Sequence, residues 1–340
     1  MKKILSIILA VLMVSSLVVS AHAADNRLTI YTAYQEEEAQ LVFNAFEKET
    51  GIKVDYVRLS AGELYARVQA EAENPQASVW FGTSVDTLSA AGEAGYLEPY
   101  TSPVEAEIPE DLRNPDHYWT GHTLSVTCFA TNMEWSKESG INPPTSWAEL
   151  LDEKYQDNVV TPHPGTSGMA FTWLNGMVAL MGEDEAFEYL KKLDKSIIQY
   201  TKGGSAPARM AGLGETGVGV CFSCDAQNAI NSGYPLEITY PEEGSPYELA
   251  GVALIKNGPA AEVENAKKFI DWAVSKEASE LFVNNFNRLP ANGTVVLPKG
   301  MLSADQINVI KYDGAFSSAN RARLIARFES DVRNSENVLK

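Results

Sequence analysis

The chain has 340 residues with 27 basic and 45 acidic side chains, which gives a formal net charge of −18. Nucleic acids and anionic lipid surfaces are bound through clustered Lys and Arg, so this composition argues against either as a partner. A small anionic ligand is not excluded, because it responds to the local field of its pocket. The length predicts two domains rather than one.

The first 23 residues have the pattern of a secretory signal peptide. Met1, Lys2 and Lys3 form a basic start, residues 4–14 are almost entirely apolar, and residues 21–23 (A-H-A) form a small-x-small cleavage motif. The apolar core is shorter than the roughly 20 residues of a membrane span, which disfavours an uncleaved anchor. No cysteine follows the cleavage site, so a lipid anchor is not indicated. We therefore expect a free periplasmic protein.

Hydrophobic periodicity predicts two lobes of alternating strands and helices. In the first lobe we expect strands over 28–32, 52–57 and 77–81, and helices over 36–50, 64–72 and 87–94. Further strands are expected over 124–130, 159–160, 218–222, 236–240 and 251–255, with helices over 146–151, 169–181, 185–193, 207–213, 226–232, 261–274 and 276–284. This order predicts an α/β protein with a ligand cleft beyond the carboxyl ends of its strands.

Three loops at predicted strand ends are rich in hydroxyl groups and glycine. They are P-G-T-S-G at 164–168, T-K-G-G-S-A-P at 201–207 and G-T-S at 82–84. A helix that starts in such a loop offers free backbone N–H groups and a positive dipole end to an anion. The first loop taken alone is equally consistent with a plain helix cap. Together they predict an anion site built from Thr83, Ser84, Thr166, Ser167, Gly168 and Ser205.

Two carboxylates follow other predicted strands. Asp225 comes after the strand at 218–222, and Glu243 comes after the strand at 236–240. Each could accept hydrogen bonds from ligand hydroxyls or an amine, although Asp225 could equally cap the helix that follows it. Beside an anion site, they fit a ligand with a phosphate-like end and a polar end.

The sequence gives little support for catalysis. Beyond the signal peptide only His117, His122 and His163 remain, and none has a metal-binding spacing such as H-E-x-x-H. The loop at 164–168 lacks the G-x-S-x-G spacing of a nucleophile elbow, so a secreted serine hydrolase using Ser167 is the weaker alternative. We expect no enzymatic activity, no cofactor and no metal.

Three cysteines are present, Cys128, Cys221 and Cys224. In an oxidising compartment one disulfide is possible, and one thiol is then left over. Cys221 and Cys224 have the C-x-x-C spacing of redox sites but lack a companion pair, so a redox protein is a further, weaker alternative. The sequence leaves open whether these two form a disulfide.

Nine stretches between residues 28 and about 327 resemble one family. They are LTIYTA (28–33), FEKETGIKV (46–54), VWFG (79–82), GYLEPY (95–100), TSG (166–168), KGGSAP (202–207), YPEEG (240–244), GVALI (251–255) and FIDWA (269–273). In this order they resemble the ferric-iron, phosphonate and hexose-phosphate branch of the periplasmic solute-binding proteins of ABC transporters.

The resemblance implies a two-lobe type II periplasmic binding protein fold that closes around a solute and delivers it to an inner-membrane ABC permease. It implies a first lobe over 24–125, a second lobe over 126–249, and a return to the first lobe with C-terminal helices over 250–340. Strands 124–130 and 251–255 are the expected hinge. A monomer is expected.

The resemblance leaves the ligand open. Ferric-binding members carry two adjacent tyrosines after the strand that here ends at Phe222, where this chain has Ser223, Cys224 and Asp225. Sugar-phosphate-like members carry a His-Asp pair where Cys224 and Asp225 stand. We therefore favour a phosphorylated sugar or phosphonate over ferric iron, which remains the alternative. Thr32, Met169 and Cys224 complete the expected ligand-binding set.

Overall fold

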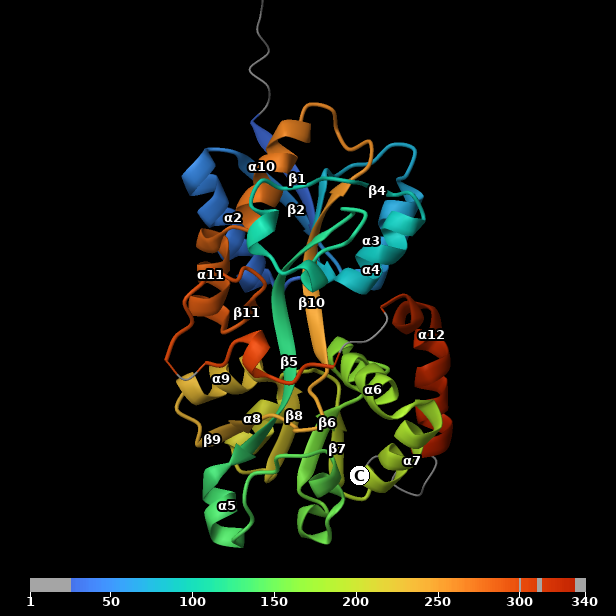
Figure 1. Ribbon diagram of the computed structural model, residues 1–340, viewed down its shortest axis with the longest axis vertical. Coiled ribbons are helices and arrows are strands. Elements are labelled where there is room, and N and C mark those ends of the chain that lie inside the picture. Colours follow the sequence, from blue (N-terminus) through green and yellow to red (C-terminus); the bar gives the residue numbers. More distant parts are fainter. Residues whose placement is uncertain (1–25, 300, 311–313, 334–340) are drawn as a thin grey trace, which may run out of the picture.

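The structure is a computed structural model that describes residues 26–299, 301–310 and 314–333. The predicted signal peptide, residues 1–23, lies outside these ranges. Within them, no helix combines the length and the apolar character needed to cross a bilayer. Figure 1 shows two α/β lobes joined by two long strands, which confirms the expected fold class.

The first lobe is built on a mostly parallel sheet in the order β2-β1-β3-β10, in which only β10 runs antiparallel. Its core is aromatic, with Phe46, Trp80, Phe81 and Phe269 fully buried. The strands are β1 (Arg27–Thr32), β2 (Lys53–Arg58), β3 (Val79–Ser84), β4 (Leu97–Glu98) and β10 (Tyr247–Ile255). The helices are α2 (Glu36–Thr50), α3 (Ala61–Ala70), α4 (Val85–Glu93), α10 (Val263–Ala273) and α11 (Lys276–Phe286).

The second lobe continues the sheet in the order β5-β8-β6-β7, and its core contains the buried Trp147, Trp173 and Phe187. Its strands are β6 (Val159–Pro162), β7 (Ile197–Thr201), β8 (Val218–Phe222) and β9 (Leu236–Thr239). Its helices are α5 (Met133–Ser139), α6 (Gly168–Met181), α7 (Glu183–Leu193), α8 (Ala206–Gly212) and α9 (Ser223–Asn231). Short elements complete the described chain: η1 (Glu105–Glu107), η2 (Glu110–Leu112), η3 (Ala148–Leu151), η4 (Glu153–Tyr155), β11 (Leu289–Pro290) and η5 (Ala304–Gln306).

Strand β5 (Thr120–Asn132) belongs to both lobes. Its first half pairs with β10, where Val126 lies opposite Tyr247, and its second half pairs with β8, from Thr127 to Thr131. Strands β5 and β10 thus run together from one lobe into the other (Figure 1). The strands expected as a hinge lie within β5 and β10, and so do the expected lobe boundaries near residues 125 and 249.

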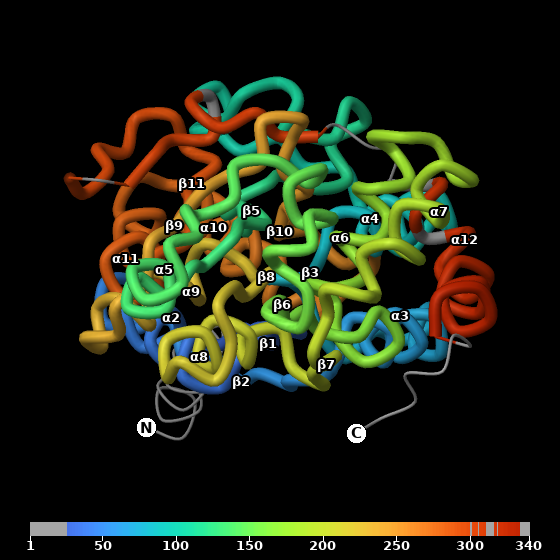
Figure 2. The backbone as a smooth tube through the Cα atoms, turned by 90° about the horizontal axis from the view of Figure 1, so that it is seen from below, coloured from blue at the N-terminus to red at the C-terminus, as the bar shows by residue number. Residues whose placement is uncertain are grey.

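A C-terminal helix, α12 (Gly314–Arg327), packs against both lobes. It contacts α4 of the first lobe and α6 of the second, and a π-helical turn (η6, Phe328–Val332) then contacts α7. Figure 2 shows α12 at the edge of the molecule beside α4 and α7. Two arginines of α12, Arg323 and Arg327, form ion pairs with Glu183 at 2.6 and 2.7 Å. The helix therefore forms a third connection between the lobes, in addition to strands β5 and β10.

Candidate functional site

A cavity of about 720 Å³ lies between the lobes, on the flank of the hinge strands occupied by α3, α4, α6 and α12. Glu248 of β10 contributes to its wall. Three of the residues expected to bind ligand, Ser84, Thr166 and Gly168, line this cleft. The lining residues are Ser60, Ala61, Gly62, Tyr65, Ser84, Asp86, Thr87, Ala90, Thr166, Gly168, Phe171, Thr172, Glu248, Ser317 and Arg321.

Three helices begin at the wall of this cleft, and each has a serine as its N-cap. The Ser60 hydroxyl accepts a hydrogen bond from the Glu63 N–H at the start of α3. The Ser84 hydroxyl accepts from the Asp86 N–H in α4, and the Ser167 hydroxyl accepts from the Ala170 N–H in α6. Each serine satisfies one N–H of its first turn, while other N–H groups and the positive dipole end stay directed outward. The cleft thus collects three helix starts, of which α3 and α4 also carry an acidic side chain in the first turn, Glu63 and Asp86.

One cation and two carboxylates are among the described residues that line the cleft: Arg321, Asp86 and Glu248. The Glu248 carboxylate lies at the start of α6, where its Oε2 is 3.9 Å from the position a Cβ on Gly168 would take. Burial raises the pKa of Glu248, while Arg288 and Arg321 oppose that rise. The cleft can therefore accept hydrogen bonds as well as donate them.

Asp225 and Cys224 lie in the first turn of α9, and neither is among the residues that line the cleft. Burial raises the pKa of Asp225 to about 6; Arg288 lowers it and Glu38 raises it further. Burial likewise raises the pKa of the Cys224 thiol to about 12. A carboxyl with a pKa near 6 can donate or accept a hydrogen bond near neutral pH, which suits recognition of a hydroxyl group.

A buried arginine holds this region together. The Arg288 guanidinium forms two hydrogen bonds with the Glu38 carboxylate, of 2.7 and 3.1 Å, and donates a third, of 2.7 Å, to the Ser125 hydroxyl. It also lies over the Tyr34 ring, whose hydroxyl hydrogen-bonds to His122 Nε2 at 2.7 Å. Because Glu38 compensates its charge, Arg288 supports the site rather than offering a free cation. Sequence patterns did not reveal Arg288 or Glu38, since neither stands in a motif.

The remaining expected site residues fall into two groups. Ser167 and Met169 are buried at the start of α6, against Gly204 of the loop that leads to Ser205. Thr32 and Thr83 are buried at the ends of β1 and β3. The Thr32 hydroxyl accepts from the Tyr34 N–H, and the Thr83 hydroxyl has no protein partner. Ser167 and Met169 thus lie at a helix start, and Thr32 and Thr83 lie at strand ends.

Glu243 lies elsewhere. Its carboxylate accepts hydrogen bonds from the backbone N–H groups of Trp147 and Ala148, at 3.0 and 3.1 Å, and so caps the 3₁₀ turn η3. Glu248 instead stands in the cleft wall. Glu248 carries no such local signal, because it is the second residue of β10 and does not follow a strand.

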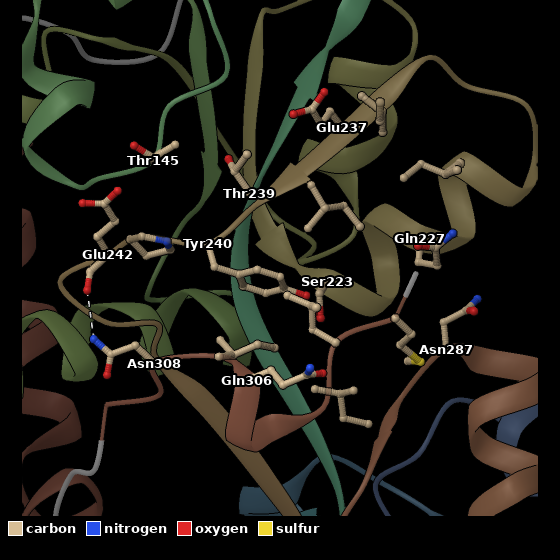
Figure 3. A pocket seen from close by; sticks show the side chains of 18 residues that line it. Thr145, Ser223, Gln227, Glu237, Thr239, Tyr240, Glu242, Asn287, Gln306 and Asn308 are labelled. Carbon is tan, nitrogen blue, oxygen red and sulfur yellow. Dashed lines mark hydrogen bonds between the residues drawn. The ribbon is translucent and has the colours of Figure 1, made fainter. Parts of the chain in front are cut away.

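A second hollow, of about 620 Å³, lies on the opposite flank of the hinge strands, between α9, β9 and the segment around η5. Figure 3 shows its lining of amides and hydroxyls, with Tyr240, Ser223, Gln227, Asn287 and Gln306 among them. Its charged lining residues, among those that the structure describes, are Glu237 and Glu242. This hollow has no cation among its described lining residues, whereas the cleft has Arg321, so it is the poorer site for an anion.

The three thiols are free and buried. Cys128 lies directly opposite Cys221 across β5 and β8, whereas Cys224 lies in the first turn of α9. In the part of the chain that the structure describes, no group of three His, Cys, Asp or Glu side chains converges on a point that could hold a metal ion.

Comparison with known proteins identifies several relatives of this chain. A protein of Haemophilus influenzae described as uncharacterized is 35% identical over 332 residues, covering 95% of each chain. The Iron uptake protein A1 of Synechocystis is 25% identical over 291 residues, covering 81% of this chain and 79% of that protein. The first description names no ligand, and the second names iron.

A solved structure is also similar to this chain. It is the periplasmic binding protein AfuA of Actinobacillus pleuropneumoniae with exogenous fructose-6-phosphate bound. The two are 34% identical, with a TM-score of 0.78 over 91% of this chain and 99% of that one. This likeness confirms the two-lobe type II fold. The family model described as bacterial extracellular solute-binding protein matches residues 42–308, so the chain belongs to that family.

Proposed function

We propose that this protein is the periplasmic solute-binding component of an ABC importer and that its cleft binds a small phosphate-bearing anion, a phosphorylated sugar or a phosphonate. The observation that carries the proposal is the convergence of the serine-capped starts of α3, α4 and α6 on one cleft. Helix N-termini are established binding sites for phosphate groups. The sugar phosphate bound by AfuA, which is 34% identical to this chain, supports the same ligand class.

The two ends of such a ligand would contact different groups of the protein. The phosphate would lie at the starts of α4 and α6, where Ser84, Thr166 and the Gly168 N–H can donate hydrogen bonds. The hydroxyl-bearing end would face the carboxyl group of Glu248, which lines the cleft beside the start of α6. We assign this second role to Glu248 rather than Glu243, because the Glu243 carboxylate is already bonded to η3.

Transport would follow from closure of the lobes. A ligand that contacts α4 of the first lobe and α6 of the second favours the closed arrangement of the hinge strands β5 and β10. The closed pair of lobes would present a continuous surface to an inner-membrane permease, with the protein acting as a monomer.

A thermal-shift screen tests the proposal. The purified protein, without residues 1–23, is heated with fructose 6-phosphate, 2-aminoethylphosphonate, inorganic phosphate, fructose and ferric citrate. At 100 times its dissociation constant, a ligand stabilises the native state by about 2.7 kcal/mol. We expect stabilisation by a phosphorylated compound and none by fructose. Stabilisation by ferric citrate alone would instead identify an iron-binding protein.

The hydrolase alternative is tested with the same protein. The Ser167 hydroxyl caps α6, and the nearby His163 ring accepts from the Gly165 N–H and contacts the Glu329 carboxylate, at 3.1 Å each. This serine and histidine therefore each have a structural contact already. We expect no turnover of phosphate or acyl esters; turnover that is lost in Ser167→Ala would overturn that expectation.

A further inference from the structure

We infer that Arg321 of the C-terminal helix α12 binds the anionic group of the ligand, so that the binding site extends beyond the two lobes. This inference rests on the proposed function, because it assigns a residue to the same cleft. The sequence patterns that predicted the anion site contain no residue of α12.

The position of α12 brings Arg321 to the start of α6. Ser317 and Arg321 stand four residues apart, on the same face of the helix, and both line the cleft. The Arg321 guanidinium carbon lies 4.2 Å from the centre of the Phe171 ring, which belongs to the first turns of α6. The cation therefore stands beside the helix end that we assign to the phosphate.

The charge distribution makes this arginine distinctive. Arg321 is the only cation among the described residues that line the cleft. Arg288, the nearby buried arginine, is held in a two-bond ion pair with Glu38. An arginine that is stacked on an aromatic ring can still donate hydrogen bonds from the N–H groups at the edge of its guanidinium. Two of these N–H groups can bond to two oxygens of one phosphate.

The anchoring of α12 places Arg321 where the two lobes meet. Leu324 and Phe328 are buried in the core of the second lobe, and Arg323 and Arg327 pair with Glu183 of α7. The same helix packs on α4 of the first lobe. Arg321 would therefore hold the anionic group between the starts of α4 and α6.

The test is isothermal titration of fructose 6-phosphate and fructose into the wild type and three variants. Arg321→Gln removes the charge. Arg321→Lys keeps the charge but lacks the planar guanidinium that can donate two parallel hydrogen bonds. Arg323→Gln, on the same helix, removes one charge that is paired with Glu183. Charge-assisted hydrogen bonds predict that Arg321→Gln weakens fructose 6-phosphate binding about 10- to 100-fold, with Arg321→Lys intermediate. Arg323→Gln is expected to stay within about threefold of the wild type.

Two readouts separate binding from structure. The dependence of affinity on salt concentration should become shallower in Arg321→Gln and remain unchanged in Arg323→Gln. Unfolding of the ligand-free variants in denaturant shows whether either substitution damages the fold. If the wild type binds fructose 6-phosphate and Arg321→Gln binds it equally well, the inference is wrong and the proposed function stands. If the wild type binds no phosphorylated compound, both are wrong.

Discussion

Burial, more than formal charge, sets the protonation of individual side chains. Asp225 is an example, since it lies in the first turn of α9 and burial raises its pKa to about 6. Arg288 is near enough to lower that pKa, but its charge is held by Glu38. The protein thus keeps an easily protonated carboxyl group in its interior.

The first prediction concerns Asp225 and pH. Its pKa is about 6 in the native state against 3.8 for the unfolded chain, so between pH 4 and 6 the native state binds more protons than the unfolded state. The free energy of unfolding therefore falls as pH rises through this window, by up to about 3 kcal/mol. Asp225→Asn should remove this part of the pH dependence in urea unfolding at pH 4, 5, 6 and 7. The exposed Asp116→Asn should retain it; an unchanged profile in Asp225→Asn would contradict the account.

The second prediction concerns the thiols. All three are buried, and burial raises the pKa of Cys224 to about 12, so the reactive thiolate is scarce at neutral pH. Protein kept reduced should therefore show no fast-reacting thiol with Ellman's reagent in the native state and three after denaturation. Rapid native reaction that is lost in Cys224→Ser would instead support the redox alternative.

At the scale of elements, one ion pair joins three segments that are distant in the sequence. Arg288, between α11 and β11, binds Glu38 in the first turn of α2 and Ser125 in the hinge strand β5. The partners are 250 and 163 residues away along the chain. The pair therefore fixes α2 and the C-terminal part of the first lobe against the strand that crosses to the second lobe.

The third prediction follows from that ion pair. Arg288→Met leaves the Glu38 carboxylate buried without its partner, which should lower the free energy of unfolding by about 3–5 kcal/mol. Adding Glu38→Gln should recover part of the loss, because the buried charge is then removed as well. Lys276→Met, which removes a solvent-exposed ion pair with Glu280, should change stability by less than about 1 kcal/mol. A loss in Arg288→Met no larger than in Lys276→Met would show that the buried pair is not important.

The elements with a strong apolar period could be predicted from the sequence. The helix expected at 36–50 is α2, whose buried face follows the period of 3.6 residues, and the strand expected at 218–222 is β8, a short apolar run that is buried throughout. Strand β7 was missed, since its edge position exposes Ile198 and Gln199 and breaks the alternation. Hydrophobic periodicity did not locate helix α12, because most of its residues are polar or small and Leu324 is its buried apolar contact.

The candidate site could be predicted only in part, for a similar reason. Serine and glycine at helix starts are local signals, so Ser84, Thr166 and Gly168 were found. Glu248 and Arg321 reach the cleft through the pairing of β10 with β5 and the packing of α12 on α6. Such long-range packing leaves no local pattern, and the same is true of Arg288.

At the scale of the whole molecule, the two hinge strands separate two hollows of similar size. Each has two carboxylates among its described lining residues, but the cleft beside α3, α4 and α6 also has three helix starts and an arginine, whereas the hollow beside α9 and β9 has no cation among its described residues. An anion that bridges the lobes is therefore better accommodated on the first flank. The acidic net charge of the chain does not oppose this, because the potential inside the cleft is set by its own walls.

Hydrogen exchange with and without fructose 6-phosphate both locates the ligand and reports closure of the lobes. We expect slower exchange at the starts of α3, α4 and α6 and in α12 near Arg321, with no comparable change around β9 and η5. Protection confined to β9 and η5, or no protection anywhere at a saturating ligand concentration, would contradict it.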